Sequence, residues 1–217
     1  MRTLMTQILA DKILTPSGWQ ANATVKIDPY GYISEVKIGK NSYDHHVGCL
    51  LPAPVNVHSH AFQRAMSGLT EYRGPDPRDS FWTWRKLMFK FLNQLTPEMV
   101  GAIAAFVQME MLESGYGTNV EFHYLHHDKN GHPYNNIAEM SDQILSATNQ
   151  TGIGLTLLPV LYQYGGCDLR PLGDGQKRFG NNIDQFAKLF QKIGVDLKSN
   201  SRDTVLGLAP HSLRAVH

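Results

Sequence analysis

The run at residues 153–161 constrains the fold most, because it is apolar on both faces of an extended strand. Such a strand is typical of a parallel sheet covered by helices. Further strand-like runs occupy residues 49–57, 119–125 and 205–209, and segments of helical period separate them. This alternation of strands and helices predicts an α/β fold with a parallel sheet.

The separating segments carry the residues that start and stop helices. Thr96 and Pro97 predict an N-cap followed by proline at the first helical position. Apolar residues then recur at helical spacing up to Gly115, where we expect the helix to end. Two later helices are predicted on the same grounds, ending at Gly152 and Gly194.

Residues 1–48 have a different pattern, with short alternating runs broken by turn residues at 16–18 and 28–32. They predict small antiparallel strands, a β-sandwich-like segment too short to close a sandwich alone, ahead of an α/β domain at residues 49–217. The glycine-rich turn of doubly wound sheets is missing after the first α/β strand. A (β/α)8 barrel would need twice this number of units. On these grounds a small open sheet and the N-terminal half of a barrel both stay open.

Composition excludes several classes of function. The formal net charge is +1, without the basic stripe that a nucleic-acid partner requires. Cys49 and Cys167 match neither a disulfide framework nor a paired-cysteine metal site. No stretch approaches the roughly 20 apolar residues that cross a bilayer, and the first residues lack the apolar core of a signal peptide. We therefore expect a cytoplasmic protein with no membrane partner.

Two histidines with one residue between them follow the first α/β strand. Residues two apart in a strand point to the same face, so His58 and His60 would aim both imidazoles at one point while Ser59 faces away. Imidazole is a common ligand of zinc and other transition metals. Alone, the pattern also fits histidines that satisfy local hydrogen bonds. A catalytic zinc takes three protein ligands, so others would have to come from elsewhere.

Further candidates follow the other strands. Tyr124 fits a substrate contact as well as a polar strand end, whereas we expect His126 and His127 to hydrogen-bond the backbone. His211 and Arg214 follow the last strand, where a guanidinium suits a carboxylate. The same segment also fits the start of a helix with a solvated arginine.

An aromatic segment at residues 80–85 ends in Arg85. It fits a lid, a subunit contact or the start of a core helix, and we favour the core for Trp82 and Trp84. Gln63, three residues after His60, fits either a ligand contact or a solvated side chain.

Taken together, these segments resemble the formimidoylglutamate deiminase branch of the amidohydrolase superfamily. The matching blocks are NVHSHAFQRAMSGLTE, SFWTWR, EFHYLHHD, TGIGLTLLPVLY, GQKRF and LAPHSLRAV, in the order of that branch. The resemblance implies the N-terminal half of a (β/α)8 barrel beside a small β domain assembled from both chain ends. It also implies a mononuclear zinc enzyme.

Carried over by motif, the resemblance makes His58 and His60 zinc ligands. It makes five residues contacts of the substrate, namely Gln63, Arg85, Tyr124, His211 and Arg214. The implied reaction is hydrolysis of N-formimidoyl-L-glutamate to N-formyl-L-glutamate and ammonia, a step of histidine breakdown.

The branch's third and fourth zinc ligands and its proton-shuttling Glu would all lie beyond His217. No catalytic acid or base is therefore assigned in this chain, and we expect it to be a truncated, inactive fragment. Its exposed edges predict a homo-oligomer. Two alternatives are another amidohydrolase deaminase acting on an aromatic ring, and a non-catalytic binding or assembly fragment.

Overall fold

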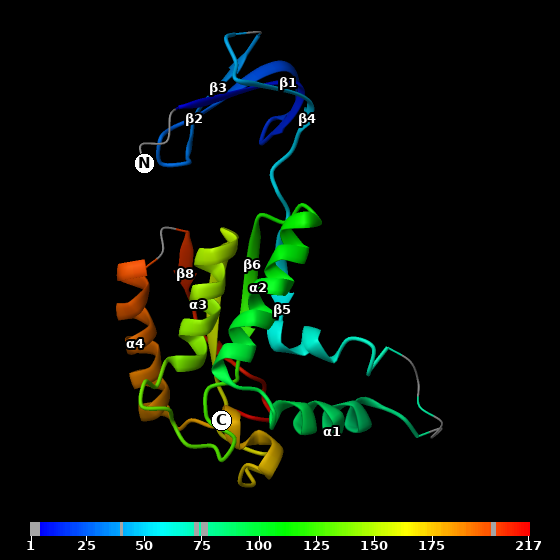
Figure 1. Ribbon diagram of the computed structural model, residues 1–217, viewed down its shortest axis with the longest axis vertical. Helices are drawn as coiled ribbons and strands as arrows, with labels where there is room; N and C mark the ends of the chain where they lie inside the picture. Colours follow the sequence, from blue (N-terminus) through cyan, green and yellow to red (C-terminus); the bar gives the residue numbers. More distant parts are fainter. Residues whose placement is uncertain (1–4, 40, 72–73, 75–77, 201–202) are drawn as a thin grey trace. The chain divides into compact units, whose positions relative to one another are not determined.

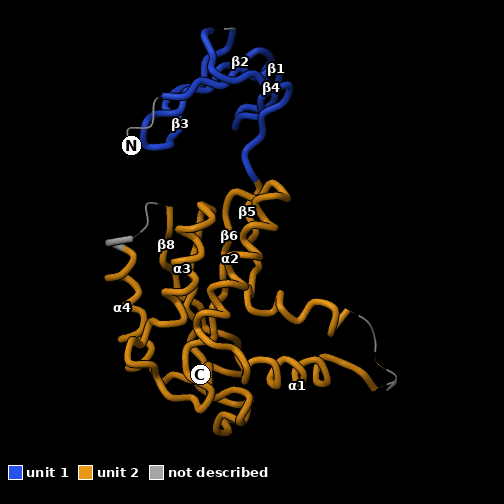
Figure 2. Tube along the Cα trace, viewed as in Figure 1, with its two compact units in different colours: residues 1–53 blue, residues 54–217 orange. Residues whose placement is uncertain are grey.

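The computed structural model describes residues 5–39, 41–71, 74, 78–200 and 203–217. The chain forms two compact units, Met1–Ala53 and Pro54–His217, coloured separately in Figure 2. The sequence had placed the division between residues 48 and 49.

The first unit is a four-stranded sheet in the order β3-β2-β1-β4. Strands β1 (Thr6–Thr15), β2 (Gly18–Ile27) and β3 (Ile33–Ile38) pair antiparallel, while β4 (His45–Leu50) pairs parallel with β1. Its small core consists of Ala10, Ile13, Ala23 and Val25. The described residues form a single sheet here, so the sandwich-like character expected from the sequence is not confirmed.

The expected strand at residues 49–57 is wrong, because the structure divides it. Strand β4 ends at Leu50 in the first unit, and β5 (Val55–Ser59) begins the sheet of the second. Pro52 and Pro54 lie in between. Proline has no N–H to donate to a ladder, so pairing stops on one side and restarts on the other.

The second unit is built on a parallel sheet, which confirms the predicted α/β fold. Strands β5, β6 (Thr118–His123), β7 (Gly154–Leu161) and β8 (Thr204–Leu206) pair in that order, and short β9 (Ala209–Pro210) also pairs with β7. The expected strand at 205–209 is therefore two short strands. All pairings are parallel, so the strands' carboxyl ends lie at one edge.

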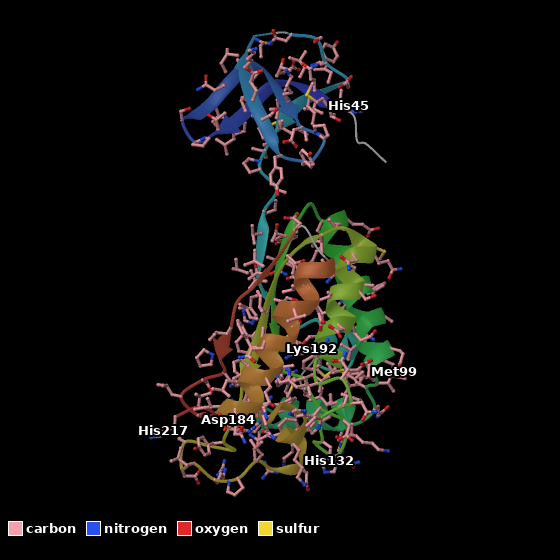
Figure 3. All side chains as sticks on the ribbon, turned by 90° about the vertical axis from the view of Figure 1, so that its left-hand side faces the viewer. His45, Met99, His132, Asp184, Lys192 and His217 are labelled. Carbon is pink, nitrogen blue, oxygen red and sulfur yellow. The ribbon has the colours of Figure 1, made fainter. Side chains whose placement is uncertain are left out.

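Helices α2 (Pro97–Glu113), α3 (Glu139–Thr151) and α4 (Ile183–Asn200) run along one face of this sheet (Figures 1 and 3). Thr96 caps α2 through its hydroxyl, which accepts from the Met99 N–H, as the sequence predicted. Gly152 ends α3 in the left-handed conformation. Gly194, by contrast, lies inside α4 and does not end it.

Helix α1 (Phe81–Leu92) and two short 3-10 helices, η1 (Ala61–Met66) and η2 (Asp174–Phe179), lie toward the carboxyl ends of the strands (Figure 1). Ser80 caps α1 by accepting from the Trp82 N–H. None of the helices in the described part of the chain combines the length and apolar character that crossing a bilayer requires.

The two faces of the sheet differ in burial. Leu155 and Leu157 of β7 are fully buried on the side of the helices. On the opposite side Val57 of β5 is 74% exposed and Val205 of β8 is 63% exposed. Helices therefore cover one apolar face, not both, among the described residues.

Candidate functional site

A cavity of about 480 Å³ lies at the carboxyl ends of β5, β6 and β7, within the second unit. Parallel strands bring residues that are far apart in sequence to this edge, which is also where barrel enzymes place their chemistry. The structure gathers there all seven residues that the sequence selected: His58, His60, Gln63, Arg85, Tyr124, His211 and Arg214.

The imidazoles of His58 and His60 converge as strand alternation predicted. Their Nε2 atoms lie 3.2 Å apart and their ring centroids 5.0 Å apart. Two nitrogens that bind one tetrahedral zinc at about 2.0–2.1 Å would be separated by roughly 3.3 Å. The spacing therefore fits two ligands of a common ion.

A backbone carbonyl on the neighbouring strand β6 fixes the orientation of the His60 imidazole. Its Nδ1 lies 3.2 Å from the carbonyl oxygen of Phe122, which can only accept, so Nδ1 carries the proton and Nε2 keeps its lone pair. Burial lowers the pKa of His60, the Phe122 carbonyl opposes that shift, and His58 lowers the pKa further. A neutral imidazole with a free Nε2 is the form that binds metal.

Two imidazoles are all that the described residues bring to this point. No group of three or more His, Cys, Asp or Glu side chains in the described ranges is placed to hold a metal ion. A catalytic zinc has three protein ligands. The residues present thus fit zinc as part of a ligand set.

The cavity carries positive charge without an acidic residue in its wall. Arg85 stacks against aromatic rings, with Cζ 4.9 Å from the centroid of Phe89 and 5.7 Å from that of Trp82. Arg214 has a buried Nε with no hydrogen-bond partner among the described residues. Neither guanidinium takes part in an ion pair with a described carboxylate. An anionic ligand would satisfy both.

Gln63 and Tyr124 form the floor of the cavity together. The Gln63 amide Nε2 donates to the Tyr124 hydroxyl at 2.7 Å, and that hydroxyl lies 3.7 Å from the sulfur of Met88. Burial raises the pKa of Tyr124 well above its usual value. The phenol therefore stays protonated, and its O–H donates to the Met88 sulfur.

His211 sits beside the two arginines. Its Nδ1 lies 2.9 Å from the Ser212 hydroxyl, and its ring packs 4.5 Å from that of Tyr162. Burial first, then the charges of Arg214 and nearby groups, lower the pKa of His211 to about 4. It is thus a neutral hydrogen-bonding group at pH 7.

Several expectations from the sequence are settled here. His126 and His127 do bond the backbone, through Nε2 to the carbonyls of Val160 at 3.0 Å and Gly180 at 2.7 Å. Trp84 lines the cavity, whereas Trp82 is 57% exposed and so is not a core residue.

Sequence reasoning missed part of the cavity wall. Leu158, Tyr162 and Phe179 also line it. Leu158 lies in the apolar run of the third α/β strand, and Tyr162 follows its end. Leu158 is the partner of Phe122 in the β6–β7 register, so it shares the cavity face with Phe122. Assigning each residue of the apolar run to one face of the strand could have found it.

Comparison with known proteins shows which solved structures and sequences the chain resembles. No family model matches the chain. A crystal structure of an amidohydrolase from Brucella melitensis superposes with a TM-score of 0.91 at 43% identity, covering 97% of this chain and 47% of that one. Atrazine chlorohydrolase from Arthrobacter aurescens TC1, crystallised with zinc, shares the fold alone, with a TM-score of 0.70 at 16% identity. In both sequence and fold, the chain is thus similar to an amidohydrolase over about half of that protein's length.

A second similarity, in sequence, covers nearly the whole chain. Formimidoylglutamate deiminase from Pseudomonas aeruginosa is 44% identical over 214 residues, which is 98% of this chain and 47% of the relative. The resemblance expected from the sequence blocks is confirmed. The chain spans about half the length of the relatives it matches.

Proposed function

We propose that this chain provides the first half of a zinc-dependent formimidoylglutamate deiminase, with N-formimidoyl-L-glutamate as its small-molecule substrate. The observation that carries the proposal is the pair of guanidiniums without carboxylate partners, Arg85 and Arg214, in one cavity with the converging imidazoles of His58 and His60. A glutamate moiety has two carboxylates, and each guanidinium can bind one through two parallel hydrogen bonds.

In this proposal His58 and His60 hold the zinc through Nε2, and the Phe122 carbonyl keeps the proton of His60 on Nδ1. When bound, zinc supplies the Lewis-acid chemistry that activates water toward the formimino C=N carbon. Tyr124 stays protonated, and a substrate would exchange the weak bond of its O–H to the Met88 sulfur for one of its own. The reaction yields N-formyl-L-glutamate and ammonia, as in histidine breakdown.

The proposed architecture is the N-terminal half of a (β/α)8 barrel at residues 49–217, after a small β segment at residues 1–48 that belongs to a composite β domain. Two observations support it. The face of the sheet away from the helices is apolar and open. In the first unit an apolar groove of about 750 Å³ runs along β1 to β3, as expected of a surface that further strands cover.

Exposed free thiols at Cys49 and Cys167 support the cytoplasm as the location.

We also propose that these 217 residues alone bind zinc weakly, do not release ammonia, and associate with a second copy. Two imidazoles fall short of a catalytic ligand set. The outer strands β5 and β8 expose apolar side chains such as Val57 and Val205. Light scattering that gives a monomeric mass would contradict the association, and tight zinc with turnover would contradict the incomplete site.

The test of the substrate class is binding of N-formyl-L-glutamate to this chain, followed by NMR titration. We expect Arg85→Ala and Arg214→Ala each to weaken binding by about 10-fold or more, because a charged hydrogen bond contributes roughly 1.5–3 kcal/mol. Arg170→Ala is the matched control, because Arg170 is 61% exposed and pairs with Asp168 at 3.7 Å. Unchanged binding in both cavity variants would overturn the assignment.

One observation favours a second candidate, a deaminase acting on an aromatic ring. The rings of Phe81, Trp84, Phe89 and Phe122 line the cavity and could stack on a heterocycle. Titration with adenine or a neutral triazine separates the two. Binding of the ring compound that survives loss of both arginines would favour this second candidate over the deiminase.

A further inference from the structure

Glu121 is a carboxylate in the middle of β6 that points away from the cavity. Its neighbours Val120 and Phe122 line the cavity, whereas Glu121 is 1% exposed on the opposite face, toward the helices. A buried carboxylate is costly unless several donors satisfy it. Its hydrogen-bond partners therefore indicate what it is for.

Two of the donors to Glu121 flank His60 in the chain. The Ser59 hydroxyl donates to Oε2 at 2.6 Å, and the Ala61 N–H donates to Oε1 at 2.7 Å. A third donor, Asn119 Nδ2, lies 3.4 Å from Oε2. The carboxylate thus binds the side-chain hydroxyl of the residue before His60 and the backbone N–H of the residue after it, and each of its oxygens accepts at least one bond.

The ladder between β5 and β6 leaves this stretch in need of such support. Asn56 pairs with Asn119 and Ser59 pairs with Glu121, so the register shifts between Asn56 and Ser59. Within that irregular stretch His58 keeps a hydrogen bond from its N–H to the Asn56 Oδ1 at 3.1 Å. The ladder to β6 is therefore irregular at the residues that carry the two imidazoles.

We propose that Glu121 is a positioning residue that holds His58 and His60 convergent by binding the Ser59 hydroxyl and the Ala61 N–H. The inference rests on the proposed function only in treating the two imidazoles as zinc ligands. Glu121 touches neither the cavity nor the metal position, so it acts entirely through the loop that carries His60. Groups that orient metal ligands typically change metal affinity by 10–100-fold when replaced.

A glutamine at this position would keep the shape and lose the function. The amide has one accepting oxygen, and its NH2 would face either the Ser59 hydroxyl or the Ala61 N–H. Ser59→Ala is a gentler second variant, because it removes one bond and leaves the carboxylate on Ala61. Gln108→Ala is the matched control, since Gln108 is 1% exposed and bonds Thr148 and Thr151 without touching this loop.

The first readout is the tautomer of His60 in the metal-free chain, measured by long-range ¹⁵N–¹H NMR of the imidazoles. We expect a single Nδ1–H form in the wild-type chain and in Gln108→Ala, and an averaged spectrum in Glu121→Gln. Ser59→Ala should move the same resonances less. If Glu121→Gln fails to fold, Ser59→Ala alone decides. A folded variant of either kind with wild-type His60 resonances would overturn the inference.

The second readout is zinc affinity by competition with a chromogenic chelator. We expect Glu121→Gln to weaken zinc binding by about 10–100-fold and Gln108→Ala to change it less than about twofold. Binding of N-formyl-L-glutamate that does not depend on Arg85 or Arg214, with the His60 tautomer still dependent on Glu121, would count against the proposed function and leave the positioning role standing. The two failures are thus distinguishable.

Discussion

Arg178 is a buried guanidinium whose removal should cost the fold several kcal/mol. It is 2% exposed, and it binds carbonyl oxygens instead of a carboxylate. The Nη1 group donates to Leu92 O, Nη2 donates to Leu95 O at 3.0 Å, and Nε donates to His127 O at 2.9 Å. Arg178 thereby connects the C-terminal end of α1 to the loop after β6. Helix α1 also carries Arg85, nearer its start.

The magnitude follows from two opposing effects. Three hydrogen bonds from a charged donor contribute about 6 kcal/mol at roughly 2 kcal/mol each. Burial lowers the pKa of Arg178, and desolvation of an ion costs several kcal/mol. We expect the bonds to win, so that Arg178→Met lowers the free energy of unfolding by about 3 kcal/mol.

The assay is urea unfolding followed by tryptophan fluorescence, since Trp82 and Trp84 lie on α1. Arg178→Lys should destabilise at least as much as Arg178→Met, because an ammonium stays charged but lacks the fork that reaches three acceptors. Arg170→Met, at an exposed arginine, should change stability by less than about 0.5 kcal/mol. A Met variant as stable as the wild-type chain would refute the reasoning by showing that desolvation cancels the bonds.

Three further predictions concern the second unit. Burial lowers the pKa of His123 to about 4, so the unfolded chain binds the extra proton and about 3 kcal/mol of stability should be lost as pH falls from 6.5 to 4. His123→Leu should reduce that loss in acid unfolding, and the other histidines whose pKa burial lowers, such as His211, should keep the rest of the slope. The control His132→Leu, at a surface histidine (Figure 3), should leave the slope unchanged. Gly175→Ala should cost roughly 1–3 kcal/mol, because a Cβ there overlaps the Phe89 ring; an unchanged melting temperature would show that α1 yields. Leu157→Ala should cost about 2–5 kcal/mol, because Leu157 is fully buried, and a smaller loss in urea unfolding would mean that the core collapses into the space.

Much of the site could be predicted because it depends on rules that act within a strand and at its end. Alternation placed His58 and His60 together, and their Nε2 atoms are 3.2 Å apart. The shared edge of a parallel sheet then brought Tyr124 and Arg214 to the same cavity. These inferences need no knowledge of which distant segments pack together.

The remainder depends on such long-range packing. A carboxylate at Glu121 in an alternating strand looks like a solvated residue, because its donors at Ser59 and Ala61 belong to another strand. Gly194 looks like a helix stop, yet α4 continues past it. A Cβ at Gly194 would lie 3.6 Å from the Leu206 side chain. At this glycine α4 therefore packs against β8, a contact that the local sequence does not reveal.

The alternation of β6 has a practical consequence for anyone who alters this protein. Val120 and Phe122 face the cavity, while Asn119, Glu121 and His123 are buried on the far side. Alternating residues of one short strand therefore determine two different properties. One set determines the shape of the cavity, and the other determines the packing and rigidity of the sheet. A mutagenesis library confined to Val120 and Phe122 should yield altered selectivity in folded proteins, whereas one that includes the intervening positions should yield mainly losses.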